Sequence, residues 1–304
     1  MNLSNLLTMQ CMLIALMFLG YFLMKIGMID AGGKKLLMDL VIYVTLPCSI
    51  VKSFIIEFNG EIFKNCIQIF IVSIVFCVLA WILGKFIFPG YEEKRKKVLQ
   101  YGTICSNAGI LGNPVAEGAF GSMGLLYASI YLIPLRTFMW SVGITYFTEA
   151  PSKKALVKKV VTHPCIIAVG IGLVLMLMQW SLPGFLGTTV ASLASANTSL
   201  SMMLIGTILC SVPWREMVDK DSLYYCFIRL VVDPAIIYVV CRIFHVETLV
   251  MGVSVLLAAM PAASVTAVMA AKYDKDANFA ARIVALSTIL SMVTAPLWCL
   301  LFVG

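Results

Sequence analysis

The sequence predicts an all-α membrane protein, and three observations support this prediction. Hydrophobic residues make up 61% of the 304 residues and charged residues 12%, against about 45–50% and about 25% in soluble domains. The apolar residues fall in long runs, and a helix needs about 20 of them to cross a bilayer. Only short polar connections separate the runs, so no stretch predicts a separate soluble domain.

The apolar runs predict ten transmembrane helices. We place them at residues 3–24, 35–56, 62–84, 97–121, 123–148, 164–180, 190–212, 222–243, 248–271 and 279–303. The first run is too long for a signal-peptide core and has no basic leader, so we expect it to stay in the mature protein. The ten cysteines are scattered singly without metal-ligand spacing, and we expect neither a metal site nor a cofactor.

Lysine and arginine are distributed unevenly between alternate loops. Seventeen of them follow the first, third, fifth, seventh and ninth predicted spans, and three lie on the opposite side. Because cytoplasmic loops carry the excess of basic residues, we expect a multi-pass protein of the cell membrane with both termini outside. The same asymmetry explains the net charge of +7 without a nucleic-acid partner and favours contact with anionic lipid. The sequence is also compatible with a homodimer.

Corresponding irregularities in the two halves predict an internal repeat. The longest polar connection, near residues 149–163, divides the chain into residues 1–150 and 151–304, each with five predicted spans. Because five is odd, two similar halves would insert in opposite orientations. The fourth span contains ILGNPVAEG and the ninth AAMPAASVTA, each with a proline near mid-membrane. Broken helices at matching positions are typical of inverted-repeat transporters.

The broken helices predict an anion site. Proline lacks an N–H donor, so Pro114 and Pro261 should each begin the second half of a broken helix. The two half-helix N-termini would then face a common point and attract a negative group. Asn107, Asn113 and Ser264 would supply polar contacts to this substrate group. Two alternatives stay open: asparagines that only cap the broken ends, and an ordinary proline kink without a site.

The strings SNAGILGNP (106–114) and LLAAMPAAS (256–264), with the ten-span layout, resemble the auxin efflux carrier family. This family includes plant PIN proteins and bacterial malonate or malate permeases, and the resemblance covers essentially the whole chain. It implies a scaffold of helices 1, 2, 6 and 7 and a transport domain of helices 3–5 and 8–10. Broken helices 4 and 9 would cross at the substrate site. Plant members have an asparagine where this chain has Met260, which favours a small carboxylate other than auxin.

Charged side chains within predicted spans are further candidates for function. Arg229 and Asp233 lie four residues apart and so share a helix face, which predicts a mutually neutralising ion pair. Proton coupling is the alternative role for Asp233. Arg136 has no obvious local partner. Glu117, Asp233 and the substrate carboxylate are the three partners that we consider for it.

These features predict a secondary carrier that moves a small organic anion by alternating access, and not an enzyme. The sequence has no G-x-x-x-x-G-K-[ST] phosphate loop, which argues against direct ATP drive. A sodium-coupled symporter resembling the bile acid family is an alternative of similar architecture. An intramembrane enzyme is disfavoured because the predicted spans contain no convincing paired acids, histidine cluster or Ser/Lys dyad.

Overall fold

The computed structural model describes residues 3–148, 152–210 and 217–302, where the chain forms helices and one isolated β-bridge. The first half contains α1 (Leu3–Lys25), α2 (Ala31–Leu40), η1 (Val41–Thr45), α3 (Leu46–Ser53), α4 (Gly60–Phe86), α5 (Glu93–Ile104), η2 (Ala108–Gly112), α6 (Asn113–Ser141) and η3 (Gly143–Tyr146). The second contains α7 (Lys153–Val161), α8 (Pro164–Met178), α9 (Gly184–Leu209), α10 (Lys220–Phe227), η5 (Ile228–Val232), α11 (Asp233–Ile243), α12 (Thr248–Ala258), α13 (Val265–Lys272) and α14 (Ala277–Leu300). The predicted all-α class is confirmed.

The long helices agree with a multi-pass membrane protein. Within the described ranges, six helical segments are long and apolar enough to cross a membrane, and the bent pair α7–α8 makes a seventh. The longest segment, residues 108–146, bends at Gly121, where φ is 68° and glycine alone is unstrained. The helix breaks near residues 105–107 and 259–264 also divide predicted spans into shorter pieces. The count of ten transmembrane helices therefore stays a prediction.

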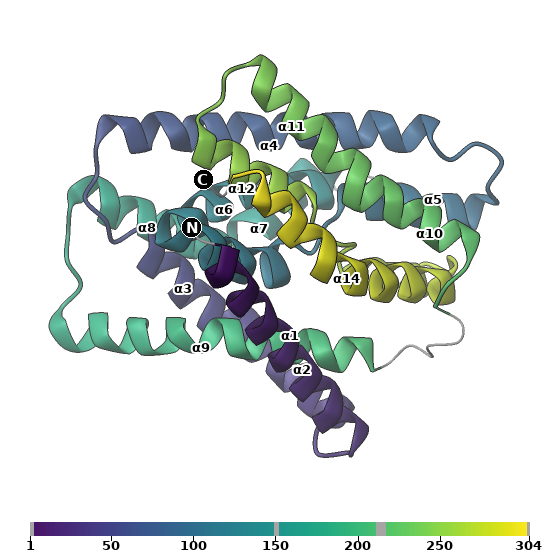
Figure 1. Cartoon of the computed structure of the whole chain (residues 1–304), viewed down its shortest axis with the longest axis horizontal. Helices are drawn as coiled ribbons and strands as arrows, with labels where there is room; N and C mark the ends of the chain where they lie inside the picture. The colour runs from purple at the N-terminus through teal and green to yellow at the C-terminus, as the bar shows by residue number, and fades with distance from the viewer. Residues whose placement is uncertain (1–2, 149–151, 211–216, 303–304) are drawn as a thin grey trace.

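Two groups of helices pack mainly among themselves (Figure 1). In the first group, α1 and α3 pack against α9, and α3 also packs against α8. The second group joins α4, α5, α6 and α10–α14 through contacts such as α4 with α6 and α11 with α12. In Figure 1, α4 and α9 lie at opposite edges of the molecule. The groups meet where α6 contacts α1, α3, α8 and α9, where α14 contacts α1, and where η2 contacts α9.

Ion pairs tie three helix starts together at one end of the second group. Arg95 in α5 contacts Asp221 in α10 at 2.8 Å and Asp276, which precedes α14, at 3.1 Å. Arg282 in α14 contacts Asp219, the cap of α10, at 2.9 Å. Burial raises the pKa of Asp219, but hydrogen bonds from the first turn of α10 and the Arg282 charge outweigh it and hold this pKa below its ordinary value. These contacts fix α5, α10 and α14 relative to one another.

Three π-turns allow helices to continue through proline. The described π-turns η1, η2 and η5 each end two residues before a proline, which is Pro47, Pro114 or Pro234. A proline ring clashes with the carbonyl of the preceding turn, and a wider turn relieves that clash without ending the helix. The backbone is already helical at Gly112, with φ −67° and ψ −40°. The prediction that Pro114 begins a half-helix is therefore wrong, because the helix resumes at Ala108.

Pro261 does not begin the second half of its broken helix, contrary to the prediction. The second broken helix ends at Ala258 and resumes at Val265, with Ser264 as the residue before its first turn. Pro261 is within the non-helical connection, where its carbonyl oxygen accepts a hydrogen bond from the Asn107 N–H at 2.8 Å. A residue held in this extended pairing cannot also begin the α13 helix. The break itself, near residues 259–264, lies where the sequence predicts it.

Candidate functional site

The two helix breaks bind each other through their backbones. The Asn107 N–H donates to the Pro261 carbonyl at 2.8 Å, and the Ala263 N–H donates to the Cys105 carbonyl at 2.9 Å. These two bonds form an isolated antiparallel bridge between segments that are far apart in the sequence. Non-helical backbone at membrane depth must have its polar groups satisfied within the protein. Reciprocal pairing does this, so the side chains of the breaks are not needed as caps.

Arg229 neutralises the ends of both broken helices. Its guanidinium donates to the Met260 carbonyl at 2.9 Å, to the Thr103 carbonyl at 3.1 Å and to the Asp233 carboxylate at 2.7 Å. The Arg229 side chain is 0% exposed and that of Asp233 2%. The predicted ion pair is therefore confirmed. The α5 and α12 helices end with their carbonyls toward this cation, which the partial negative charge of a helix C-terminus favours.

The two asparagines do not cap the broken ends. Asn107 precedes η2, but its side chain makes no capping hydrogen bond. Asn113 is 0% exposed, and neither its amide nitrogen nor its amide oxygen has a hydrogen-bond partner. An unpaired buried carboxamide is costly, about 1–3 kcal/mol. The alternative that both asparagines serve only as caps is wrong.

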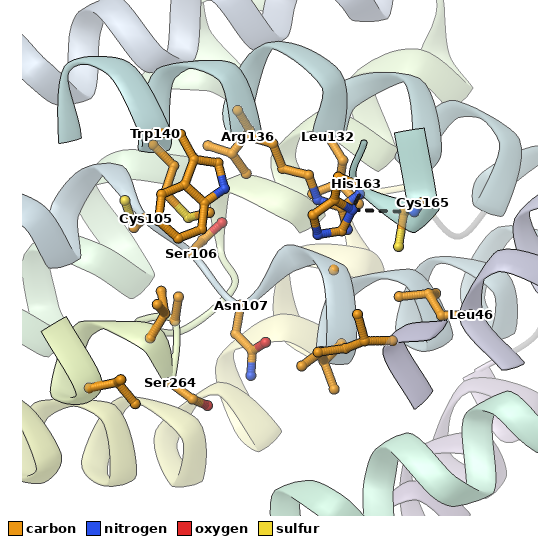
Figure 2. Close-up of a pocket in the computed structure, with 18 of the residues that line it drawn as sticks. Leu46, Cys105, Ser106, Asn107, Leu132, Arg136, Trp140, His163, Cys165 and Ser264 are labelled. Atoms are coloured by element: carbon orange, nitrogen blue, oxygen red, sulfur yellow. Dashed lines mark hydrogen bonds between the residues drawn. The ribbon is translucent and has the colours of Figure 1, made fainter. Parts of the chain in front are cut away.

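A cavity of about 360 Å³ lies beside the paired breaks (Figure 2). Its walls come from the breaks, from η2, α6 and α13, and from α2, η1, α3 and the start of α8. It brings together three of the predicted site residues, Asn107, Ser264 and Arg136. The other predicted site residues do not line it: Asn113, Pro114, Pro261, Arg229 and Asp233.

Arg136 projects from α6 toward His163 at one end of the cavity (Figure 2). Its Nη1 atom lies 3.5 Å from His163 Nδ1, and among the described residues it forms no salt bridge. Gly109 permits this position, because a Cβ atom there would lie 3.1 Å from Arg136 Nη2. Neither predicted carboxylate partner is present: Asp233 binds Arg229, and Glu117 is attracted by Lys52 on α3.

His163 lines the cavity, but the sequence did not predict it as a site residue. Its Nδ1 atom accepts a hydrogen bond from the Cys165 N–H at 3.2 Å, which caps α8. Proline at the first position of a helix follows a capping residue, so the His163-Pro164 pair was an available signal for the cap. The approach to Arg136 joins residues far apart in the sequence, and no local pattern predicts it.

Comparison with known proteins identifies the family. The model of the family described as membrane transport protein matches residues 7–299. The chain belongs to this family. Similar proteins include an uncharacterized transporter of Methanothermobacter thermautotrophicus, 29% identical over 94% of both chains. An uncharacterized transporter of Methanocaldococcus jannaschii is 28% identical over 93% of this chain and 94% of its own, and the uncharacterized transporter YfdV of Escherichia coli is 22% identical over 94% of both.

Membership of the membrane transport protein family confirms the resemblance to auxin efflux carriers and makes this chain a membrane transporter. The relatives are named as transporters, which favours transport over catalysis. What the cavity can bind follows from its own side chains.

The cavity of this membrane transport protein is mostly apolar around one positive charge. Apart from Arg136, its polar side chains are Ser106, Asn107, His163 and Ser264. Large apolar side chains supply most of the remaining wall: Met38, Ile42, Leu46, Leu132, Leu135, Met139, Trp140, Val265 and Val268. A guanidinium in apolar surroundings binds a carboxylate strongly, because water competes little and the hydrogen bonds are charge-assisted. The arrangement fits binding of an anion with an apolar body.

Proposed function

We propose that this protein is a secondary carrier for a small organic anion, with the carboxylate held by Arg136. The single observation that carries the proposal is the Arg136 guanidinium, which faces the cavity without a salt bridge among the described residues. A cation that lacks a protein counterion in an apolar cavity is stabilised by an anionic ligand. Asn107 and Ser264 would add neutral hydrogen bonds to the same ligand.

Movement by alternating access is supported by the position of the cavity between the two helix groups. Arg136 belongs to α6 in the second group, whereas His163 directly precedes α8 in the first. A displacement of one group against the other would separate these two side chains and change access to the bound anion. In this proposal, helices 1, 2, 6 and 7 of the sequence prediction form the scaffold, and helices 3–5 and 8–10 form the transport domain.

The proposal includes ten spans in two inverted repeats, residues 1–150 and 151–304, in the cell membrane with both termini outside. Paired breaks at corresponding places in the two halves support it. Ser152 and Ser181 flank α7 and α8 and are both exposed. Cysteines placed there in a cysteine-depleted background should react with an impermeant reagent from opposite sides. Equal labelling of both in intact cells would contradict the inverted arrangement.

Asn113 is part of the proposed substrate site in another conformation. It does not line the cavity, but it lies where η2 joins α6, and η2 contacts α9 of the first group. Movement of the groups would open this contact and allow the unpaired Asn113 carboxamide to reach the ligand. Pro114 and Pro261 would shape the backbone near the site without contacting the ligand through donors, since proline has none.

The charge of the cavity predicts a preference among carboxylates. One guanidinium can neutralise one carboxylate, and a second carboxylate in the apolar wall would be desolvated without a partner. We expect monocarboxylates with an apolar body to stabilise the purified protein against heat, and dicarboxylates of similar length to do so weakly, because stabilisation follows binding to the folded state. Stabilisation by none of these compounds would contradict the proposed function, and preference for dicarboxylates would contradict the role of a single cation.

Sodium coupling is the alternative that the crossover geometry disfavours. Arg229 already donates to the Met260 and Thr103 carbonyls and to the Asp233 carboxylate, which are the kinds of oxygen atom that could hold a cation. Uptake of the stabilising carboxylate into proteoliposomes should therefore proceed equally with sodium and with choline. Uptake that requires sodium would support the symporter instead.

A further inference from the structure

The short helix α7 has an unusual composition and direction. Its nine residues, Lys153–Val161, include four lysines and no acidic residue. It precedes α8 at a bend of 65°. The residue before a proline avoids helical backbone angles, and His163 precedes Pro164, so the two helices cannot continue as one straight rod. α7 therefore leaves the direction of α8 at the point where α8 begins.

The exposed surface of α7 combines an apolar strip with a basic strip. Val157 and Val161 are 59% and 58% exposed and lie four residues apart, on one helix face. Lys154 and Lys158 are also exposed and four residues apart, and together with the two valines they border one shallow groove. Water does not favour exposed valines, and the neighbouring charges of Lys154 and Lys158 repel one another. A membrane surface with anionic headgroups and an apolar interior would stabilise both the lysines and the valines.

We propose that α7 is a binding site for anionic phospholipid, with the headgroup phosphates at Lys154 and Lys158 and the acyl chains against Val157 and Val161. A basic amphipathic helix that lies along a membrane surface buries its apolar face at the boundary between headgroups and acyl chains. Residues 152–163 contain no acid, so nothing in this segment competes with phosphate for the lysines. The proposal does not depend on which anion the cavity accepts.

Lipid bound at α7 would also hold one wall of the cavity. Lys159 Nζ lies 3.3 Å from the centroid of the Trp140 ring, and Trp140 lines the cavity. Two residues after α7, His163 contacts Arg136 at 3.5 Å. Fixing α7 at the membrane surface therefore fixes two contacts of cavity side chains. Added anionic lipid should slow hydrogen exchange in residues 153–163 more than zwitterionic lipid does.

The decisive experiment counts bound lipid on the detergent-solubilised full chain by native mass spectrometry. The parent should bind phosphatidylglycerol more tightly than phosphatidylcholine. Lys154→Gln/Lys158→Gln should bind phosphatidylglycerol roughly 30-fold more weakly, from the typical contribution of two lysines near an anionic surface. The matched control Lys52→Gln/Lys64→Gln removes two exposed lysines on the predicted side that carries few basic residues and should bind like the parent.

A second variant tests the contact between the acyl chains and the two valines. Val157→Asn/Val161→Asn keeps every charge of α7, and it should weaken binding of both lipids because the acyl contact is lost. Equal binding of the two lipids by the parent would overturn the proposal, as would unchanged binding by the lysine variant. Loss of phosphatidylglycerol binding in the lysine variant but not in the valine variant would show that the site holds the headgroup phosphate without the acyl chains, and it would overturn the proposed lipid site.

Discussion

Arg229 and Arg136 are the same residue type in two different environments, and the comparison separates structure from function. Arg229 is 0% exposed and donates to two helix-end carbonyls and one carboxylate. Arg136 is partly exposed in a cavity, and its Nη1 atom contacts a histidine nitrogen at 3.5 Å. One cation has its counterion within the protein, whereas the other has an open place for one. The number of neutralising groups therefore supports Arg136, and not Arg229, as the proposed anion site.

The largest expected effect follows from removing the counterion of Arg229. Asp233→Asn should lower the free energy of unfolding by about 3–5 kcal/mol, because the buried guanidinium loses its charge partner. The measurement is chemical unfolding in detergent. Arg229→Met/Asp233→Leu should regain part of this loss, since no charge stays buried, although the Met260 and Thr103 carbonyls lose their donor. A folded Asp233→Asn protein of normal stability that has lost pH-driven uptake would instead indicate proton coupling.

Replacing Arg136 should weaken ligand binding and leave stability almost unchanged. Arg136→Gln should weaken binding of the stabilising carboxylate by roughly 10–150-fold, because a hydrogen bond to a charged group contributes about 1.5–3 kcal/mol. The melting temperature of the unliganded protein should hardly change, since no protein counterion is lost. Arg242→Gln is the matched control, because Arg242 is exposed on α11 and outside the cavity. If Arg136→Gln binds carboxylate as tightly as Arg242→Gln, Arg136 is not the anion site.

Local patterns in the sequence predicted the parts of the site that depend on local chemistry. The i,i+4 spacing was enough for the Arg229–Asp233 pair, and the glycine-rich stretch around Asn107 indicated a helix break. The prediction that Pro114 begins a half-helix was wrong, because a π-turn can accommodate a proline within a continuing helix. The sequence does not show whether a proline begins a new helix or follows a π-turn. A capping role for the two asparagines was likewise open until their hydrogen bonds were known.

Contacts between distant segments could not be predicted. Nothing in the sequence around Arg229 indicates that its guanidinium also serves the Met260 and Thr103 carbonyls, which come from two other helices. The approach of His163 to Arg136 likewise depends on how α8 packs beside α6. Such pairings arise from the whole arrangement, so local patterns in the sequence predict a charged residue and its partner on the same helix but not its distant partners.

A buried carboxamide extends the comparison to neutral groups. Asn113→Leu should raise the free energy of unfolding by about 1 kcal/mol, because an unpaired polar group is replaced by an apolar one of similar shape. Asn59→Leu should lower it by about 1 kcal/mol, because the Asn59 side chain caps α4 by accepting from the Ile62 N–H at 2.8 Å. Thermal and chemical unfolding would measure both. Destabilisation by Asn113→Leu would mean that this amide has a structural partner.

The smallest expected effect tests how closely the position of Arg136 is controlled. In Gly109→Ala the new Cβ would lie 3.1 Å from Arg136 Nη2, which is closer than ordinary van der Waals contact. The guanidinium is the flexible end of its side chain, so it should shift by a few tenths of an ångström rather than unfold the helix. Carboxylate affinity should fall by less than about tenfold, which corresponds to under about 1.4 kcal/mol. Stability should not fall, since alanine is a better helix former than glycine.

Gly170→Ala in α8 is the control for this last variant, because a Cβ atom there meets nothing within 4 Å. It should share any gain in helix stability without a change in carboxylate affinity. Neither variant changes the charge of Arg136. A difference in carboxylate affinity between them therefore reports the position of the guanidinium. Equal carboxylate affinity in both would show that the ligand follows the guanidinium wherever it lies. A loss specific to Gly109→Ala would instead show that Arg136 and the neutral groups at the paired breaks hold one ligand together, since only then does the distance between them matter.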